Sequence, residues 1–161
     1  MTAASQPERS TLLDPFVIVG LAGILFFVVG LTEVIGELYP WALGAPEWEF
    51  GTYSSMMDKL PLLTMGLGFI TVFAIARSQR VLAKVVGTLF ILFALFIFAG
   101  AFLYATNVPQ ALRVNPRSPT QTGIKKAISK SAIQTTVYPI AFLWAGFFAL
   151  RHSAKSRRQV G

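Results

Sequence analysis

The chain has 161 residues, of which 54% are hydrophobic and only 13% charged, about half the charged share of an ordinary soluble domain. A water-soluble fold of this length could not bury so much apolar surface while covering its exterior with so few charges. These proportions exclude a soluble enzyme, a soluble nucleic-acid-binding domain and a disordered tail, and they place the chain in a membrane. The net charge is +7 and there is no Cys, which excludes disulfides and thiolate metal sites.

Four apolar stretches without charged residues are long enough to cross a bilayer, which takes about 20 residues. Because lipid cannot hydrogen-bond to the backbone, each stretch is expected to be an α-helix, and runs such as 89–93 lack the alternation of a membrane β-barrel. We therefore predict an all-α integral membrane four-helix bundle that forms a single domain over residues 1–161. Its spans are expected at about 15–36, 60–77, 82–105 and 131–150, with outer loops at 37–59 and 106–130.

The first predicted span begins at Pro15, a residue suited to the first turn of a helix. The segment 1–14 is polar and has a single basic residue, Arg9. Since a secretory signal has a basic start and a cleavage site after a short apolar core, we expect this helix to be retained rather than cleaved.

Glu33 and Glu37 lie four residues apart at the end of the first span, so they share one face of a helix. A carboxylate at the membrane boundary is costly unless it faces protein, water or a cation. These two residues are candidates for a cation or proton site at an outer mouth. The alternative is an ordinary helix end in which Glu33 pairs with Lys125, Lys126 or Lys130.

The first outer segment is rich in aromatic and acidic residues. Trp and Tyr gather at membrane interfaces because their rings are apolar and carry a polar edge, so anchoring at the interface explains this segment. An aromatic-lined site for a lipid tail or a quinone is the alternative. The candidate outer interface residues here are Trp41, Glu47, Trp48 and Glu49.

The second predicted span starts near Pro61 and ends in a short basic turn that contains Arg77, Arg80 and Lys84. The third span is rich in Phe and is expected to face lipid or another subunit. Small residues recur every four positions in the fourth span, at Ala141, Ala145 and Ala149, and we expect this stripe to be a second contact face.

The second outer segment is basic, and Lys125, Lys126 and Lys130 complete the candidate outer interface. The segment from Glu33 to Lys59 holds five acids and one base. Opposite charges on one face of the bundle favour a loose cap in which the two segments approach each other, although exposed ion pairs contribute only about 0–1 kcal/mol each. The alternative is that each segment is solvated separately.

Four spans place both chain ends on one side of the membrane, and the distribution of Lys and Arg favours the cytoplasm. The segments on that side hold Arg9, Arg77, Arg80, Lys84, Arg151, Lys155, Arg157 and Arg158. The opposite segments hold Lys59, Arg113, Arg117, Lys125, Lys126 and Lys130. The side that carries the chain ends thus has eight basic residues and the opposite side six, and the short second connection has three bases and no acid. This distribution predicts cytoplasmic ends in a plasma or inner membrane.

No catalytic, cofactor or metal site is predicted, because the spans lack His and no metal-ligand spacing, phosphate loop or nucleophile motif occurs. We expect a non-catalytic accessory or structural subunit whose partners are the lipid bilayer and copies of itself or larger membrane proteins, with no nucleic acid. One alternative is an oligomeric transporter or channel with Glu33 and Glu37 at its outer mouth. Another is a lipid- or quinone-active membrane enzyme that uses the acidic outer segment.

Overall fold

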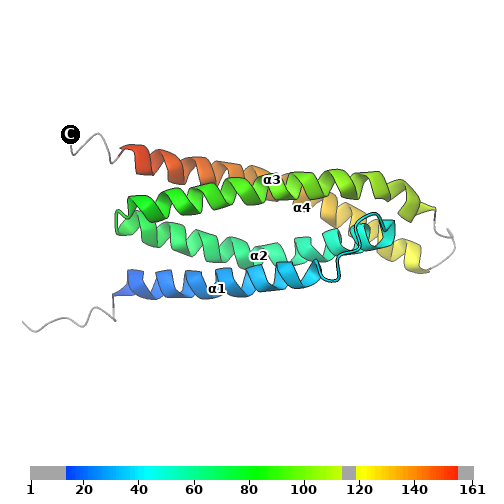
Figure 1. The fold of residues 1–161 in the computed structure, drawn as a ribbon, viewed down its shortest axis with the longest axis horizontal. Coiled ribbons are helices and arrows are strands. Elements are labelled where there is room, and N and C mark those ends of the chain that lie inside the picture. Colours follow the sequence, from blue (N-terminus) through cyan, green and yellow to red (C-terminus); the bar gives the residue numbers. More distant parts are fainter. Residues whose placement is uncertain (1–13, 114–118, 156–161) are drawn as a thin grey trace, which may run out of the picture.

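The computed structural model describes residues 14–113 and 119–155, and this part of the chain contains four α-helices and no strand. They are α1 (Pro15–Glu37), α2 (Pro46–Ala76), α3 (Arg80–Leu112) and α4 (Pro119–Lys155). Neighbouring helices run in opposite directions, so residues 14 and 155 lie at the same end of the molecule (Figure 1). We call this the terminal end, and we call the end with the α1–α2 and α3–α4 connections the distal end.

Local sequence signals explain where the helices begin. The Asp14 carboxylate caps α1 by accepting a hydrogen bond of 2.9 Å from the Phe16 N–H, and Pro15 occupies the first turn, where its missing N–H costs nothing. Pro46 likewise occupies the first turn of α2, although the N-cap residue there, Ala45, makes no side-chain cap. α1 stops at Glu37, whereas α2, α3 and α4 continue at the distal end through most of the segments expected to be outer loops.

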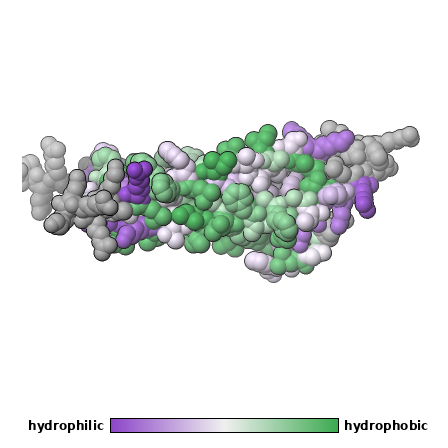
Figure 2. All heavy atoms as spheres, turned by 90° about the horizontal axis from the view of Figure 1, so that it is seen from above, coloured by the Kyte–Doolittle hydropathy of each residue, from purple (hydrophilic) through white to green (hydrophobic). Residues whose placement is uncertain are grey.

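All four helices are long and apolar enough to span a membrane. Many of their large apolar side chains are exposed, including Leu21, Leu25, Leu92 and Phe147. Figure 2 shows a hydrophobic band over the middle of one face, with hydrophilic residues towards both ends. This arrangement fits a multi-pass membrane protein whose outer surface contacts lipid.

Two ion pairs join α1 and α2. Asp14 pairs with Arg77 at the terminal end, and the Glu33 carboxylate lies 2.6 Å from the Lys59 ammonium group towards the distal end. The two pairs are separated by 19 residues along α1, which corresponds to about 28 Å of helix. That length is close to the roughly 30 Å hydrocarbon core of a bilayer.

α2 is the central helix, since within the described residues it contacts each of the other three while α1 contacts only α2. Close approach of α1 and α2 depends on glycine. A Cβ atom at Gly66 would lie 2.3 Å from the Phe27 backbone nitrogen, and one at Gly30 would lie 2.6 Å from the Leu63 nitrogen. Lipid tails give little hydrophobic drive for helix association, so backbones that approach this closely gain dispersion contacts instead.

The second close pair is α3 and α4, which cross at Gly87 and Gly146. The small-residue stripe of α4 partly serves this internal contact, because Ala149 is fully buried and Ala145 half-buried, while Ala141 is exposed. The Phe-rich helix α3 is divided in the same manner: Phe90 is buried in the core, whereas Phe96, Phe98 and Phe102 are exposed.

Candidate functional site at the distal end

A group of polar side chains lies between α2, α3 and α4 at the distal end. The Tyr53 and Thr135 hydroxyl groups are 2.6 Å apart and share a hydrogen bond between α2 and α4. The Ser131 hydroxyl donates to Ser54 at 3.3 Å, and the Gln134 amide donates to the Met57 carbonyl at 3.4 Å. These contacts link α4 to the distal half of α2.

Tyr104 of α3 completes this polar cluster. Its ring packs 4.9 Å from the rings of both Phe50 and Tyr53, and only 6% of the residue is exposed. Its hydroxyl lacks a hydrogen-bond partner at normal geometry among the described residues, although the Ser131 hydroxyl is nearby. An unpaired buried hydroxyl costs about 1–3 kcal/mol. The hydroxyl of Tyr104 therefore does not stabilise its position, and the packing of its ring against Phe50 and Tyr53 does.

The polar cluster does not continue towards the terminal end. On the terminal side of the cluster, the core consists of fully or almost fully buried apolar residues, namely Leu60, Leu63, Leu67, Ala94, Ile97 and Phe142. Movement of an ion or a proton needs polar groups or water along its path. The described part of one molecule therefore has a polar region at the distal end and an apolar core between this region and the terminal end.

A cavity of about 160 Å³ lies beside the polar cluster, on the α2–α3 side that the α1–α2 connection covers. We call it the distal pocket. Its lining is mostly apolar and includes two tryptophans, and its polar members are Glu49, Thr52 and Tyr53. The complete lining is Leu38, Trp41, Leu43, Trp48, Glu49, Thr52, Tyr53, Met56, Phe96, Ala99, Gly100 and Leu103.

Glu49 is fixed by two neutral donors. Its Oε1 atom accepts a hydrogen bond of 2.8 Å from the Gly44 N–H, and its Oε2 atom accepts one from the Asn107 side-chain amide. Asn107 is itself buried on α3 and also donates to the Leu103 carbonyl at 3.0 Å. These bonds join the α1–α2 connection, α2 and α3 beside the pocket, whose exposed lining is almost entirely apolar.

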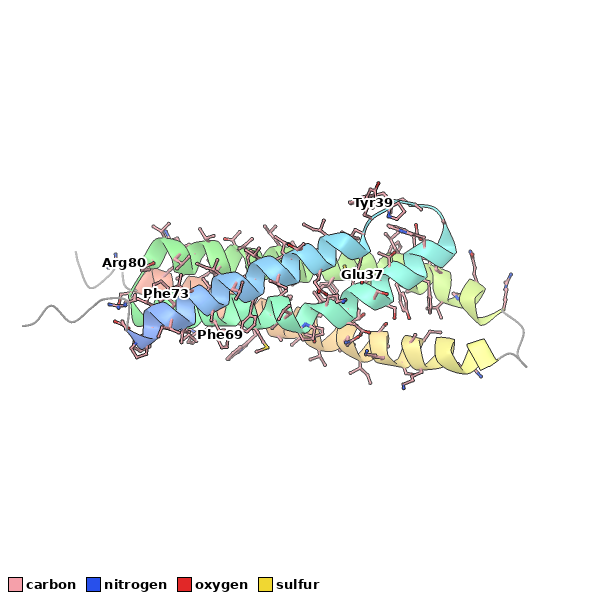
Figure 3. The ribbon with its side chains drawn as sticks, turned by 90° about the horizontal axis from the view of Figure 1, so that it is seen from below. Glu37, Tyr39, Phe69, Phe73 and Arg80 are labelled. Atoms are coloured by element: carbon pink, nitrogen blue, oxygen red, sulfur yellow. The ribbon has the colours of Figure 1, made fainter. Side chains whose placement is uncertain are left out.

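The structure places Glu33 and Glu37 near the distal end of α1. Glu33 is paired with Lys59, and about two fifths of each side chain is exposed. Glu37, the last residue of α1, is half-buried and close enough to Lys59 to attract its ammonium group. Figure 3 shows Glu37 at this end of α1 and Tyr39 projecting from the connection, while Phe69, Phe73 and Arg80 lie towards the terminal end.

The remaining predicted residues fall on different parts of the distal end. Trp41, Trp48 and Glu49 share the distal pocket, whereas the Glu47 side chain lies outside the part of the chain that the structure describes. Lys125 and Lys126 are exposed on α4.

Lys130 joins the basic and acidic outer segments. Its ammonium group lies 2.6 Å from the Asp58 carboxylate, and about half of each side chain is exposed. One ion pair therefore links the segments whose opposite charges favoured a cap. Glu33 does not take Lys130 as its partner, because Lys59 on the neighbouring helix occupies that role.

Tyr104 and Asn107 are site residues that the sequence analysis did not single out. Tyr104 and Asn107 are three residues apart, which places them on one face of a helix, and this spacing was the available signal. It was missed because the third span was expected to end at 105, whereas α3 continues to Leu112.

Comparison of the chain with protein-family models, curated proteins and solved structures gave no match. Within residues 14–113 and 119–155, no three His, Cys, Asp or Glu residues are grouped so that they could hold a metal ion.

Proposed function

We propose that this protein is a non-catalytic accessory or structural subunit that associates with itself or with larger membrane proteins. The observation that carries this proposal is the exposed position of α1, which within residues 14–113 and 119–155 is attached to the bundle only through α2. A helix attached on one side presents most of its surface to lipid or to a partner helix.

An apolar groove of about 220 Å³ follows from this arrangement. It lies between α1, α2 and α3, and all of its lining residues are apolar or Gly: Val17, Gly20, Leu21, Ile24, Phe27, Leu67, Ile70, Phe73, Leu82, Val85, Val86 and Leu89. We call it the α1–α3 groove. Because a transmembrane helix gains stability by close packing rather than by leaving lipid, an apolar groove that small residues and Gly help to line supports association with another helix.

The transporter or channel alternative receives less support. The buried apolar residues Leu60, Leu63 and Phe142 lie between the polar cluster and the terminal end. Glu33 is paired with Lys59. A pathway would have to form between copies of the chain. The enzyme alternative is favoured by one observation, the distal pocket with its single carboxylate.

We also propose that the terminal end faces the cytoplasm. Arg77, Arg80, Lys84 and Arg151 lie at this end of the helices, as the positive-inside rule requires. Attachment of a membrane-impermeant thiol reagent to a cysteine introduced at Ser78 in the α2–α3 turn tests this orientation in intact cells. Labelling before lysis would contradict it.

Native mass spectrometry in a mild nonionic detergent tests the subunit proposal. We expect a defined assembly, and we expect Val85→Trp, which fills the α1–α3 groove, to dissociate it. Leu92→Trp is the matched control, because Leu92 is exposed on α3 outside the groove. If the unsubstituted chain and both variants are all monomeric, the proposal is overturned. A monomer that retains a lipid or quinone favours the enzyme alternative.

A further inference from the structure

We infer that the terminal end binds the phosphate head groups of anionic bilayer lipids at a surface that α3 and α4 form together. We call it the basic terminal surface, and it consists of Arg80, Lys84, Arg151 and His152. The inference concerns a lipid site. It depends neither on the partner of the α1–α3 groove nor on the side of the membrane that the terminal end faces.

The charge of the terminal end is the first observation. Segments 77–84 and 151–158 of the sequence hold seven basic residues and no acidic one. Asp14 is the single acid at this end among the described residues, and its carboxylate is paired with Arg77. The terminal end therefore has an excess of positive charge, which attracts anions.

The crossing of α3 and α4 brings basic residues of both helices to one level. A Cβ atom at Gly87 would lie 2.9 Å from Cγ of Leu150, so these two positions are in contact. Lys84 comes three residues before Gly87, and Arg151 directly follows Leu150. Because the two helices run in opposite directions (Figure 1), both basic residues lie within one turn of this contact, on its terminal side.

Arg80 and His152 lie beside the same crossing. They line a recess of about 10 Å³ between the α2–α3 turn and α4. This volume is about the space of one water molecule, so a phosphate group cannot enter it. A head group would lie over the surface instead, within reach of side chains from both helices.

Lys84 and Arg151 are suited to bind phosphate. Both are exposed, and neither forms an ion pair with a described residue. Both lie in the terminal turns of membrane spans, one of which begins at Arg80 while the other ends at Ser153. From such positions long basic side chains reach the head-group region, where they bind phosphate oxygens through charge-assisted hydrogen bonds.

Exposed apolar residues on the same helix faces indicate a lipid rather than a soluble anion. On α4, Phe147 and Trp144 lie four and seven residues before Arg151, so the three residues share one face. On α3, Leu95 lies three turns beyond Lys84. Phe147, Trp144 and Leu95 are 64%, 72% and 56% exposed. A lipid whose phosphate contacts the basic residues can lay its acyl chains along these faces.

The distal end fits anionic lipids less well, although it also has basic residues. Lys59 is paired with Glu33, and Lys130 is paired with Asp58. The segment from Glu33 to Lys59 holds five acids and one base, so an anionic head group is repelled there.

Native mass spectrometry of the full-length chain in a nonionic detergent provides the test. Phosphatidylglycerol and phosphatidylethanolamine with acyl chains of different mass but equal length and unsaturation are added in equal amounts, so that the head group is the main difference. Basic residues at a membrane boundary attract anionic head groups. We expect the chain to retain phosphatidylglycerol about tenfold more strongly, a difference of about 1.4 kcal/mol.

Two double variants of equal charge make the result specific. Lys84→Gln with Arg151→Gln should reduce the preference for phosphatidylglycerol at least about fivefold. Lys125→Gln with Lys126→Gln removes the same charge from exposed distal positions of α4 and should keep the preference, as should the charge-conserving pair Lys84→Arg with Arg151→Lys. Circular dichroism verifies the helix content of each variant. Equal losses in the two glutamine variants, or no preference in the unsubstituted chain, overturn the inference.

Thermal unfolding in mixed micelles distinguishes a lipid from an acidic polypeptide, because a ligand of the folded chain raises the unfolding midpoint. Phosphatidylglycerol should raise the midpoint of the unsubstituted chain above its value in phosphatidylethanolamine. It should raise that of the Lys84→Gln, Arg151→Gln variant much less. If soluble polyglutamate raises the midpoint and phosphatidylglycerol does not, the basic terminal surface binds an acidic polypeptide and the inference is wrong.

Discussion

Gly66 sets the distance between α1 and α2. A Cβ atom there would lie 2.3 Å from the Phe27 nitrogen and 2.6 Å from its Cα, and both are backbone atoms that a rotamer change cannot move. We expect Gly66→Ala to force the helices apart and to lower the free energy of unfolding by about 1–3 kcal/mol, the usual cost of overpacking.

The control for this change is two residues away on the same helix. Gly68 has no atom within 4 Å of its would-be Cβ, so Gly68→Ala should change stability by less than about 0.5 kcal/mol. Denaturation in mixed micelles, followed by circular dichroism, measures both variants. Equal stability of the two would show that α1 does not pack on α2 at this position.

The hydrogen bond between Tyr53 and Thr135 can be measured by a double-mutant cycle. Tyr53→Phe and Thr135→Val each remove one hydroxyl of the 2.6 Å contact, and each leaves the other hydroxyl without this partner. We expect a coupling free energy of about 0.6–1.7 kcal/mol, the range of interhelical hydrogen bonds in membrane proteins. Strictly additive effects in the same denaturation assay would contradict the contact.

At the scale of the elements, adjacent residues of α2 hold two different helices. Asp58 pairs with Lys130 of α4 and Lys59 pairs with Glu33 of α1, because successive positions on a helix point about 100° apart. The central place of α2 is therefore visible in its charges as well as in its packing.

Charge reversal tests the contact between α2 and α4. Asp58→Lys places two ammonium groups together and should destabilise the chain, while addition of Lys130→Asp should restore the pair. Both side chains are about half exposed, so the coupling should be about 0.2–1 kcal/mol. Lys126→Asp is the matched control, since Lys126 is exposed on the same helix. Restoration by Lys126→Asp as strong as by Lys130→Asp would argue against a specific pair.

The sequence predicted the existence of the four helices but not their distal extent. Charged residues mark where a helix leaves lipid, and this criterion placed boundaries near Lys59, Ala105 and Lys130. A helix does not have to end there, because water satisfies its exposed polar side chains and the packing of α2, α3 and α4 continues. Pro61, near which the second span was expected to start, consequently lies inside α2, and Pro109 lies inside α3.

The candidate site was predictable only in part. Trp41, Trp48 and Glu49 are close in sequence, so their grouping could be read directly. The opposite wall of the pocket, formed by α3 residues such as Phe96 and Leu103, depends on how α2 and α3 pack. The partner of Glu33 also depends on tertiary contact, because several lysines were equally available and only the α1–α2 crossing brings Lys59 to it.

At the scale of the whole molecule, α1 is a peripheral helix. The chain has no native Cys, so crosslinking of introduced cysteines can map its position. Phe26 and Phe69 have ring centroids 5.9 Å apart, and the pair Phe26→Cys and Phe69→Cys should crosslink with a short thiol reagent. Phe26→Cys with Trp144→Cys should not, because α1 does not contact α4 in the described structure. Efficient crosslinking of the second pair within a monomer would mean a closed bundle.

The spacing of the two α1–α2 ion pairs has a consequence for where the protein can reside. In a bilayer much thicker than about 28 Å, one pair would have to enter hydrocarbon or the surrounding lipid would have to thin, and either form of hydrophobic mismatch costs free energy. The chain should consequently partition into thinner domains of a laterally heterogeneous membrane, and lengthening the acyl chains of a reconstituted bilayer should drive its molecules to cluster.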